Sequence, residues 1–153
     1  LARLPDYHRS FCMRSIHHRG TVEAPGLVLA LDKWPGASCL GLALAVREGH
    51  EDATLAYLRE RELVSSAYLE KTLELELTDG RKVQAVTYVI DPVHDQYCGG
   101  MPLEEQAGII ARAVGGRGPN TEYLHNTVAH LRALGIDDAD LEWLDERVRA
   151  ICG

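Results

Sequence analysis

The chain has 153 residues, of which 46% are apolar, and this is enough to bury the hydrophobic core of one domain. Its 23 acidic residues outnumber its 16 basic residues and give a formal net charge of −7. Nucleic acids and anionic membrane surfaces are bound through clustered Lys and Arg, so this charge argues against both as partners, and no stretch has the roughly 20 apolar residues of a membrane-spanning helix.

The first part of the chain alternates apolar runs with turn signals. We expect irregular structure over residues 1–20, which are rich in His and Arg, and a buried strand over residues 27–31. Pro and Gly predict a turn over residues 34–38, and a second apolar run predicts a strand over residues 39–46. Apolar side chains among charges then predict a helix over residues 51–61.

A β-hairpin is the clearest local signal. Apolar and charged residues alternate over residues 73–77, which is the pattern of a strand with one buried and one solvated face. Asp79-Gly80 follows and predicts a two-residue turn with both residues at positive φ. The return strand over residues 83–90 has apolar residues on both faces, so we expect it to be central in the sheet.

Three helices are predicted after residue 100, and strands followed by helices indicate an α+β domain. Pro102 can begin a helix over residues 103–114. Asn120 is predicted to cap the second helix and Asp138 the third, each with an apolar stripe at helical spacing. The stripes are Leu124, Val128, Leu131 and Leu134 in the second helix, and Leu141, Leu144, Val148 and Ile151 in the third.

The spacing of cysteine and histidine does not predict a metal site. The four cysteines form no Cys-x-x-Cys pair, which predicts reduced thiols in a cytoplasmic protein. His17 and His18 are adjacent and would point to opposite faces of a strand, and the other histidines show no ligand spacing. We therefore expect no metal.

Two other segments have a conceivable chemical role. Ser65-Ser66 lacks a Gly-x-Ser-x-Gly elbow and ordered His and Asp partners, so a serine hydrolase is not expected. The Gly-rich segment 115–120 could hold an anion with exposed N–H groups, or could be a turn and helix cap, which is the commoner role of such residues.

Glu62 is the candidate for proton transfer because it lies where the predicted helix ends and the β-patterned run begins. An acid at such a junction can reach into whatever the sheet encloses. Alternatively, Glu62 is one more solvated carboxylate on an acidic protein, which is the common state of Glu.

Five segments, in the same order and covering nearly the whole chain, resemble the ChaC family of γ-glutamylcyclotransferases. They are Tyr7-His8-Arg9-Ser10-Phe11-Cys12; His18-Arg19-Gly20-Thr21 with Pro25-Gly26; Arg61-Glu62 with Tyr68; Ala85 to Pro92, which ends in Ile-Asp-Pro; and Gly118-Pro119-Asn120-Thr121-Glu122-Tyr123-Leu124. Each segment alone is weak evidence, whereas the five in order are specific.

The resemblance implies a small mixed β-barrel of the γ-glutamylcyclotransferase-like type, with C-terminal helices packed around it and residues 1–153 in a single domain. It also implies cleavage of glutathione to 5-oxoproline and cysteinylglycine without a cofactor, by one cavity Glu that maps to Glu62. Arg61 could pair with the glycine carboxylate of glutathione, and Tyr68 and Tyr123 could offer hydroxyls to it. The alternatives are a surface arginine and two half-buried core tyrosines.

The sequence departs from the family pattern at two places. Similar proteins usually begin with a strand and loop that contain Gly-Tyr-Gly-Ser-Leu, which this sequence does not show, so we expect the first strand and part of the pocket to be missing. Ser66-Ala67 stand where Gly-Gly often precedes the matched tyrosine, and their side chains could narrow the pocket.

These departures keep two other functions open. One is cyclisation of another γ-glutamyl amine or peptide. The other is a non-catalytic barrel that binds a γ-glutamyl-like ligand or a partner. The sequence predicts no oligomeric state.

Overall fold

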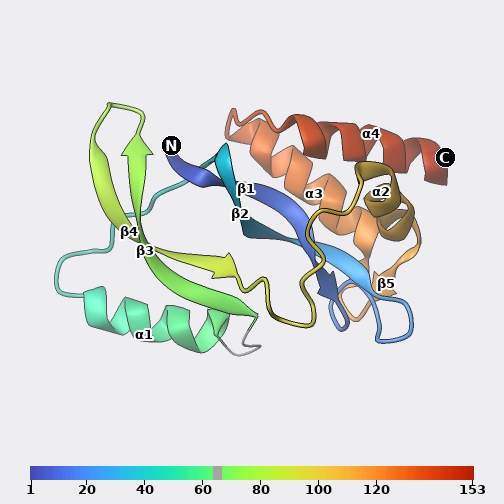
Figure 1. Ribbon diagram of the computed structural model, residues 1–153, viewed down its shortest axis with the longest axis horizontal. Helices are drawn as coiled ribbons and strands as arrows, with labels where there is room; N and C mark the ends of the chain where they lie inside the picture. The colour runs from blue at the N-terminus through green and yellow to red at the C-terminus, as the bar shows by residue number, and fades with distance from the viewer. Residues whose placement is uncertain (64–66) are drawn as a thin grey trace. The chain divides into compact units, whose positions relative to one another are not determined.

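The computed structural model describes residues 1–63 and 67–153 (Figure 1). Its elements are, in chain order, β1 (Ala2–Ser15), β2 (Gly26–Gly41), α1 (Glu51–Glu62), β3 (Tyr68–Leu77), β4 (Lys82–Ile90), α2 (Leu103–Arg112), β5 (Val114–Gly115), β6 (Gly118–Pro119), α3 (Asn120–Ala133) and α4 (Ala139–Cys152). Antiparallel strands come mainly before the helices, which confirms the predicted α+β class.

The chain forms two compact units. The first comprises Leu1–Arg9 and Leu31–Tyr97, and the second comprises Ser10–Ala30 and Cys98–Gly153. The long strands form one sheet in the order β2-β1-β3-β4, in which β1 with β3 and β3 with β4 are antiparallel. Because β2 and β4 are the edges of this sheet, the strands of the described residues do not close into the barrel that the resemblance implies.

Ala2–Ser15 form a long strand, so the prediction of irregular structure over residues 1–20 is wrong except at residues 16–20. Side chains alternate at the start of β1, where Ala2 and Leu4 are buried and Arg3 between them is exposed. The buried core of the first unit consists of Ala2, Leu4, Tyr7, Leu75 and Val89. The alternation is interrupted at Asp6, which has a φ of 65°, so the sequence did not show this strand.

The turn predicted over residues 34–38 lies within β2 instead. Gly36 has a φ of 86°, and its N–H donates to Oδ1 of Asp6 at 3.1 Å. The Gly-containing segment therefore marks an irregularity inside a long strand, not a reversal of the chain. The strand predicted over residues 39–46 ends at Gly41, and residues 42–46 are exposed.

The predicted hairpin is confirmed as β3 and β4, with a different turn. The N–H of Leu77 donates to the carbonyl of Arg81 at 2.8 Å, so residues 78–80 form a three-residue loop. Gly80 has a φ of 89° and Asp79 has a negative φ, as expected for a type I turn followed by a bulge. β4 is an edge strand, so the prediction of a central strand is wrong.

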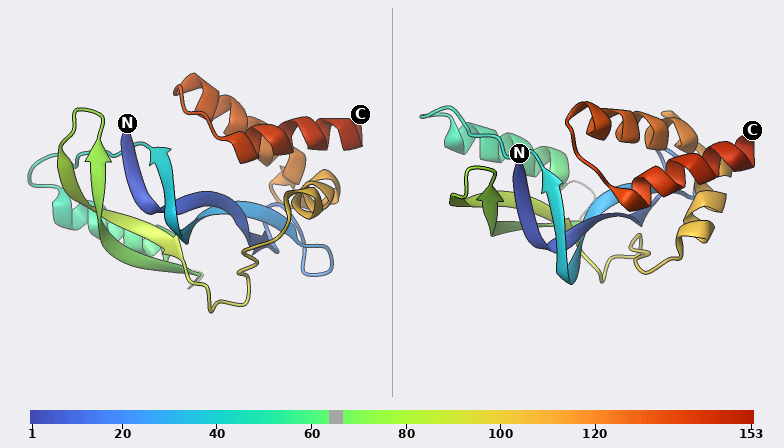
Figure 2. Two further views of the ribbon diagram at one scale, coloured as in Figure 1. Left: turned by 45° about the horizontal axis from the view of Figure 1, so that its top comes forward. Right: turned by 90° about the horizontal axis from the view of Figure 1, so that it is seen from above.

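The helices α2, α3 and α4 pack together in the second unit (Figure 2). Both predicted stripes are buried through most of their length, at Leu124, Val128, Leu131, Leu141, Leu144 and Val148. Asp138 caps α4 as predicted, since its carboxylate accepts from the N–H of Leu141 at 3.2 Å. Among the described residues, no helix is both long and apolar enough to cross a bilayer.

Asn120 does not cap α3, and this part of the prediction is wrong. The residue is fully buried, and its side chain binds the backbone of Leu27 in two directions. The N–H of Leu27 donates to Oδ1 at 2.8 Å, and Nδ2 donates to the carbonyl of Leu27 at 2.9 Å. The amide thus completes the hydrogen bonding of β2 near its first residue.

Candidate active site

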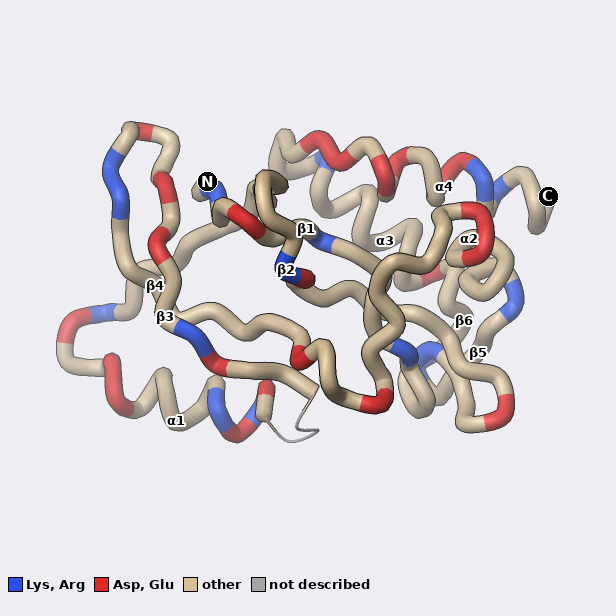
Figure 3. The backbone as a smooth tube through the Cα atoms, in the orientation of Figure 1, with Lys and Arg blue, Asp and Glu red and all other residues tan. Residues whose placement is uncertain are grey.

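Glu62 is the last residue of α1, in the first unit. Its side chain is 31% exposed, and Oε1 lies 3.8 Å from Nε of Arg61, whose own side chain is 67% exposed. Basic and acidic residues alternate over the last four residues of α1 (Figure 3), and none of its twelve residues is buried. Glu62 is therefore a half-buried carboxylate on a helix that has little packing of its own.

The hairpin that follows supplies a second carboxylate, Glu70. Register places Tyr88 of β4 directly opposite Glu70 of β3, and the Tyr88 hydroxyl donates to Oε1 of Glu70 at 2.7 Å. Arg59 of α1 donates to both carboxylate oxygens, with Nε and Nη2 each 3.0 Å from the nearest one. The three side chains join α1, β3 and β4.

These contacts fix the charges of the cluster. The hydrogen bonds from Arg59 and then from Tyr88 lower the pKa of Glu70 from its usual value. Burial, followed by the hydrogen bond to Glu70, raises the pKa of Tyr88 to about 12. At neutral pH, Glu70 is therefore an anion paired with Arg59, and Tyr88 is a neutral phenol.

Glu62 lies near this cluster. It is three residues beyond Arg59, a spacing that puts both side chains on the same side of a helix. The charge of Glu62 is also one of the smaller causes that raise the pKa of Tyr88. Among the described residues, none forms a hydrogen bond to the Glu62 carboxylate. Of Glu62 and Glu70, Glu62 is thus the one whose oxygens remain available for a proton.

The other predicted substrate-binding residues are distributed between both units. Arg61 adjoins Glu62, and Tyr68 is the half-buried first residue of β3, opposite Ile90. Ser65 and Ser66, which the sequence analysis considered as a nucleophile and as residues that could narrow the pocket, lie outside the described residues.

Tyr123 lies on α3 in the second unit. Its hydroxyl accepts from the N–H of Leu29 at 3.1 Å, and its ring meets Phe11 edge-on with 6.0 Å between ring centroids. The guanidinium of Arg19 lies 5.7 Å from the ring centroid. Burial raises the pKa of Tyr123. These contacts give Tyr123 a framework role in α3 and β2, and substrate binding by this residue stays a prediction.

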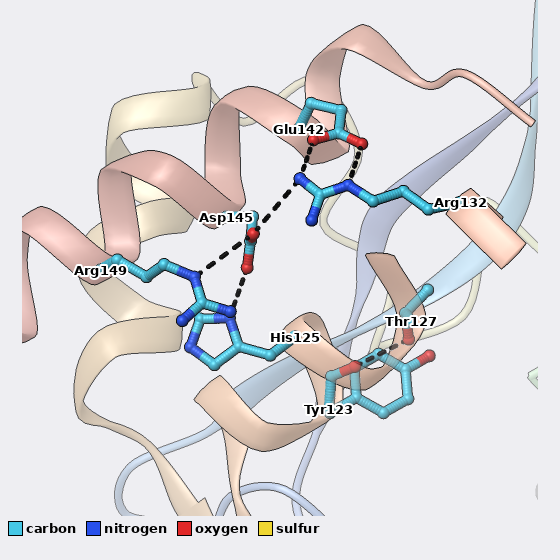
Figure 4. A network of polar contacts seen from close by, with 7 residues as sticks. All are labelled: Tyr123, His125, Thr127, Arg132, Glu142, Asp145 and Arg149. Carbon is cyan, nitrogen blue, oxygen red and sulfur yellow. Dashed lines mark hydrogen bonds and ion pairs between the residues drawn. The ribbon is translucent and has the colours of Figure 1, made fainter. Parts of the chain in front are cut away.

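A polar network that the sequence did not indicate joins α3 and α4 (Figure 4). Asp145 is only 3% exposed, and its Oδ1 is hydrogen-bonded to Nδ1 of His125. Its Oδ2 accepts from Nε of Arg149 at 3.4 Å and lies 3.8 Å from Nη2 of Arg132. Arg132 also binds Glu142, with Nε 2.9 Å from Oε1. The network surrounds one buried carboxylate with positive or ionisable groups.

The anion site considered for the Gly-rich segment 115–120 is not formed. The N–H groups of Gly116 and Arg117 donate to the carbonyls of His17 and His18, at 2.7 and 2.8 Å. These donors are used within the backbone, so the turn interpretation holds. The described residues also contain no group of three or more His, Cys, Asp or Glu side chains that could hold a metal ion.

Sequence reasoning missed Arg59, Glu70 and Tyr88. The signal that could have found them is the register of the hairpin, because Glu70 and Tyr88 are matched across the two strands. The two-residue turn that was predicted would have paired Glu70 with Val89 instead, on the other face of β4.

Comparison with known proteins gives consistent matches. The profile of a family described as ChaC-like protein matches residues 1–151. A glutathione-specific γ-glutamylcyclotransferase of Escherichia coli (strain K12) is 36% identical over 138 residues, which are 90% of this chain and 59% of that protein. γ-Glutamylcyclotransferase 2-3 of Arabidopsis thaliana is 31% identical over 151 residues, which are 95% of this chain and 76% of that protein.

The fold is similar to that of a solved structure. A selenomethionine-labelled γ-glutamylcyclotransferase specific to glutathione from yeast superposes with a TM-score of 0.83 over 97% of this chain and 86% of that chain. The sequences are 22% identical, so this likeness concerns the fold alone.

Proposed function

The chain belongs to the ChaC-like family, and on this premise we propose that it is a γ-glutamylcyclotransferase that cleaves glutathione to 5-oxoproline and cysteinylglycine. The chain spans 59% of the length of the bacterial relative. Family membership supports the reaction class, and glutathione is the substrate named for relatives from Escherichia coli and Danio rerio.

The reaction needs a proton acceptor more than it needs a protein nucleophile. The α-amine of the γ-glutamyl group attacks the γ-carbonyl of the same group, and a C–N bond forms that closes a five-membered ring. Because the reaction is intramolecular, binding the substrate in a folded conformation supplies much of the acceleration. The α-amine is an ammonium at neutral pH, and it must lose a proton before it attacks.

Glu62 is the group that we propose for this proton transfer. Its carboxylate takes the proton from the ammonium, and the carbonyl oxygen becomes an oxyanion as the ring closes. The proton then passes from Glu62 to the amide nitrogen, and the bond from the γ-carbon to that nitrogen breaks as the oxyanion returns to a carbonyl. The ring nitrogen loses its second proton, and the amine of the released cysteinylglycine takes up one proton, so that the protons balance. One carboxyl group serves both steps and returns to its starting state.

One observation carries the choice of Glu62. Glu70 uses both of its oxygens for Arg59 and Tyr88, whereas Glu62 follows Arg59 by one helical turn and accepts no hydrogen bond from a described residue. Glu62 is half-buried and has its oxygens available. This difference in engagement supports Glu62 as the acid/base residue and Glu70 as part of the framework.

We propose Arg61, Tyr68 and Tyr123 as substrate-binding residues, a cytoplasmic location, and a single domain over residues 1–153. The single domain is supported by β1 and β2, each of which contributes residues to both compact units. A closed barrel would additionally require hydrogen bonds between the edge strands β2 and β4.

The reaction class is tested by incubating the protein with glutathione, without added metal, and quantifying both products. We expect 5-oxoproline and cysteinylglycine in equal amounts, and no product from glutathione that is acetylated on its α-amine, because the internal nucleophile is blocked. Binding of glutathione without either product would favour the non-catalytic alternative. Release of 5-oxoproline from other γ-glutamyl peptides only would favour the alternative substrate.

A further inference from the structure

Helix α1 carries Glu62, yet burial does not hold it in place. None of its residues is buried, and its last residues are mainly charged. A helix without a buried apolar face obtains little stability from packing. Specific contacts at its C-terminal end must therefore determine where the Glu62 carboxylate lies.

The contact that the structure provides is the bond between Arg59 and Glu70. Nε of Arg59 lies 3.0 Å from Oε1 and 3.2 Å from Oε2 of Glu70, and Nη2 lies 3.0 Å from Oε2. This is a forked contact, which fixes the orientation of both planar groups as well as their separation. Glu70 is oriented in turn by the Tyr88 hydroxyl on the neighbouring strand.

The position of this bond relates it directly to Glu62. Arg59 precedes Glu62 by three residues, about one helical turn, so fixing the Arg59 guanidinium against β3 fixes the last turn of α1. The pair is also half-exposed, with 53% of the Arg59 side chain and 23% of the Glu70 side chain accessible. Exposed ion pairs contribute little to global stability, so the main effect of the Arg59–Glu70 pair is to fix the position of the last turn of α1.

We infer that Arg59 and Glu70 are positioning residues that clamp the end of α1 to the β3–β4 hairpin and so hold Glu62 in its working place. The inference rests on the proposed function, because it gives the clamp a role in the reaction of Glu62. Neither residue touches the substrate in this account, and each acts through Glu62.

The clamp is tested with Glu70→Gln, Arg59→Lys and the double variant Arg59→Gln/Glu70→Gln. Gln keeps the size of Glu but not its charge, and Lys keeps the charge of Arg but not its fork. We expect kcat for glutathione to fall roughly 10- to 100-fold in Glu70→Gln, with a smaller fall in Arg59→Lys, while KM stays within about twofold. The double variant should lose no more than the single Glu70→Gln variant, because the two residues act as one unit.

Arg81→Gln is the matched control. It removes an arginine that is ion-paired with Asp79, in the same hairpin and at the end away from Tyr68, so kcat should be unchanged. Raising the salt concentration to 1 M should lower kcat of the wild type and of the control, and should have less effect on the double variant, which has no pair to screen.

Amide hydrogen exchange over residues 55–62 gives a readout that does not depend on activity. Glu70→Gln should accelerate exchange in this segment several-fold, because local opening of a terminal turn depends on its few contacts, whereas exchange in β3 and β4 should be unchanged. Unaltered exchange and unaltered kcat in Glu70→Gln would overturn the clamp, and loss of activity in Glu62→Gln would then leave the proposed function standing. If the wild type releases no 5-oxoproline, the proposed function fails, and the exchange experiment still decides whether the clamp exists.

Discussion

At the scale of single residues, Asn120 illustrates how one buried amide can replace a strand partner. Its side chain accepts from the N–H and donates to the carbonyl of Leu27, at 2.8 and 2.9 Å. We expect Asn120→Ala to lower the free energy of unfolding by roughly 2–4 kcal/mol, because both backbone groups would be left buried without partners. Urea unfolding would measure this loss.

Asn126→Ala provides the control for that measurement. Asn126 lies on the same helix and is exposed, so its replacement should change the free energy of unfolding by less than about 0.5 kcal/mol. Equal effects of the two substitutions would contradict the structural role of Asn120.

Tyr88 gives a second prediction at the residue scale, concerning alkaline pH. Its pKa in the folded protein is about 12, above the ordinary value of 10.0. Above pH 10 the unfolded chain loses this proton while the folded protein keeps it, so the contribution of Tyr88 to stability is complete below pH 10 and is lost as the pH rises toward 12.

Urea unfolding of the wild type and of Tyr88→Phe between pH 8 and pH 11 would check this behaviour. The stability of the wild type should decline more steeply above pH 10 than that of the variant, which has no phenol to titrate at this position. Parallel curves would show that Tyr88 has an ordinary pKa.

At the scale of elements, the hairpin shows which features local sequence patterns predict and which they do not. Alternation predicted its strands, but Asp79-Gly80 suggested a two-residue turn. The observed loop has three residues, and the Asp79 carboxylate accepts from both N and Nε of Arg81, at 3.0 and 2.7 Å. These side-chain bonds, which no pattern of hydrophobicity contains, shift the register by one residue and bring Tyr88 opposite Glu70.

The predictions for the other elements were right or wrong for similar physical reasons. The helices were predictable because their stripes and the Asp138 cap are local features. β1 was missed because its buried positions are interrupted at Asp6, which has a φ of 65°. Asn120 resembled a helix cap because its long-range partner, Leu27, is 93 residues away in sequence.

The contact between α3 and α4 carries its own prediction. Asp145 is buried among His125, Arg149 and Arg132 (Figure 4). We expect Asp145→Ala to lower the free energy of unfolding by roughly 1–3 kcal/mol, because the charge-assisted hydrogen bonds of these groups are lost. Asp140→Ala changes an exposed acid of the same helix and should have little effect. A thermal or urea unfolding comparison in which Asp145→Ala matched Asp140→Ala would contradict this account.

At the scale of the whole molecule, the family was predictable from the order of five weak motifs and not from any single spacing. The family match over residues 1–151 confirms that resemblance. The candidate site could be predicted only in part: Glu62 was identified, whereas Arg59, Glu70 and Tyr88 depend on a register and on a contact between helix and hairpin. Tyr123 was predicted as a substrate-binding residue from its place in a family motif, and in the structure its hydroxyl accepts a hydrogen bond from the backbone N–H of Leu29.

The measurement that tests the central claim most directly is the rate of 5-oxoproline release from glutathione by the wild type, Glu62→Gln and Glu60→Gln. Glu60 is an exposed acid two residues away on the same helix, so its replacement controls for charge and for helix stability. We predict that the wild type and Glu60→Gln release 5-oxoproline at similar rates, and that Glu62→Gln loses at least about 100-fold in rate, because no other group takes the ammonium proton. Equal rates for Glu62→Gln and the wild type would contradict the assignment of Glu62 as the acid/base residue.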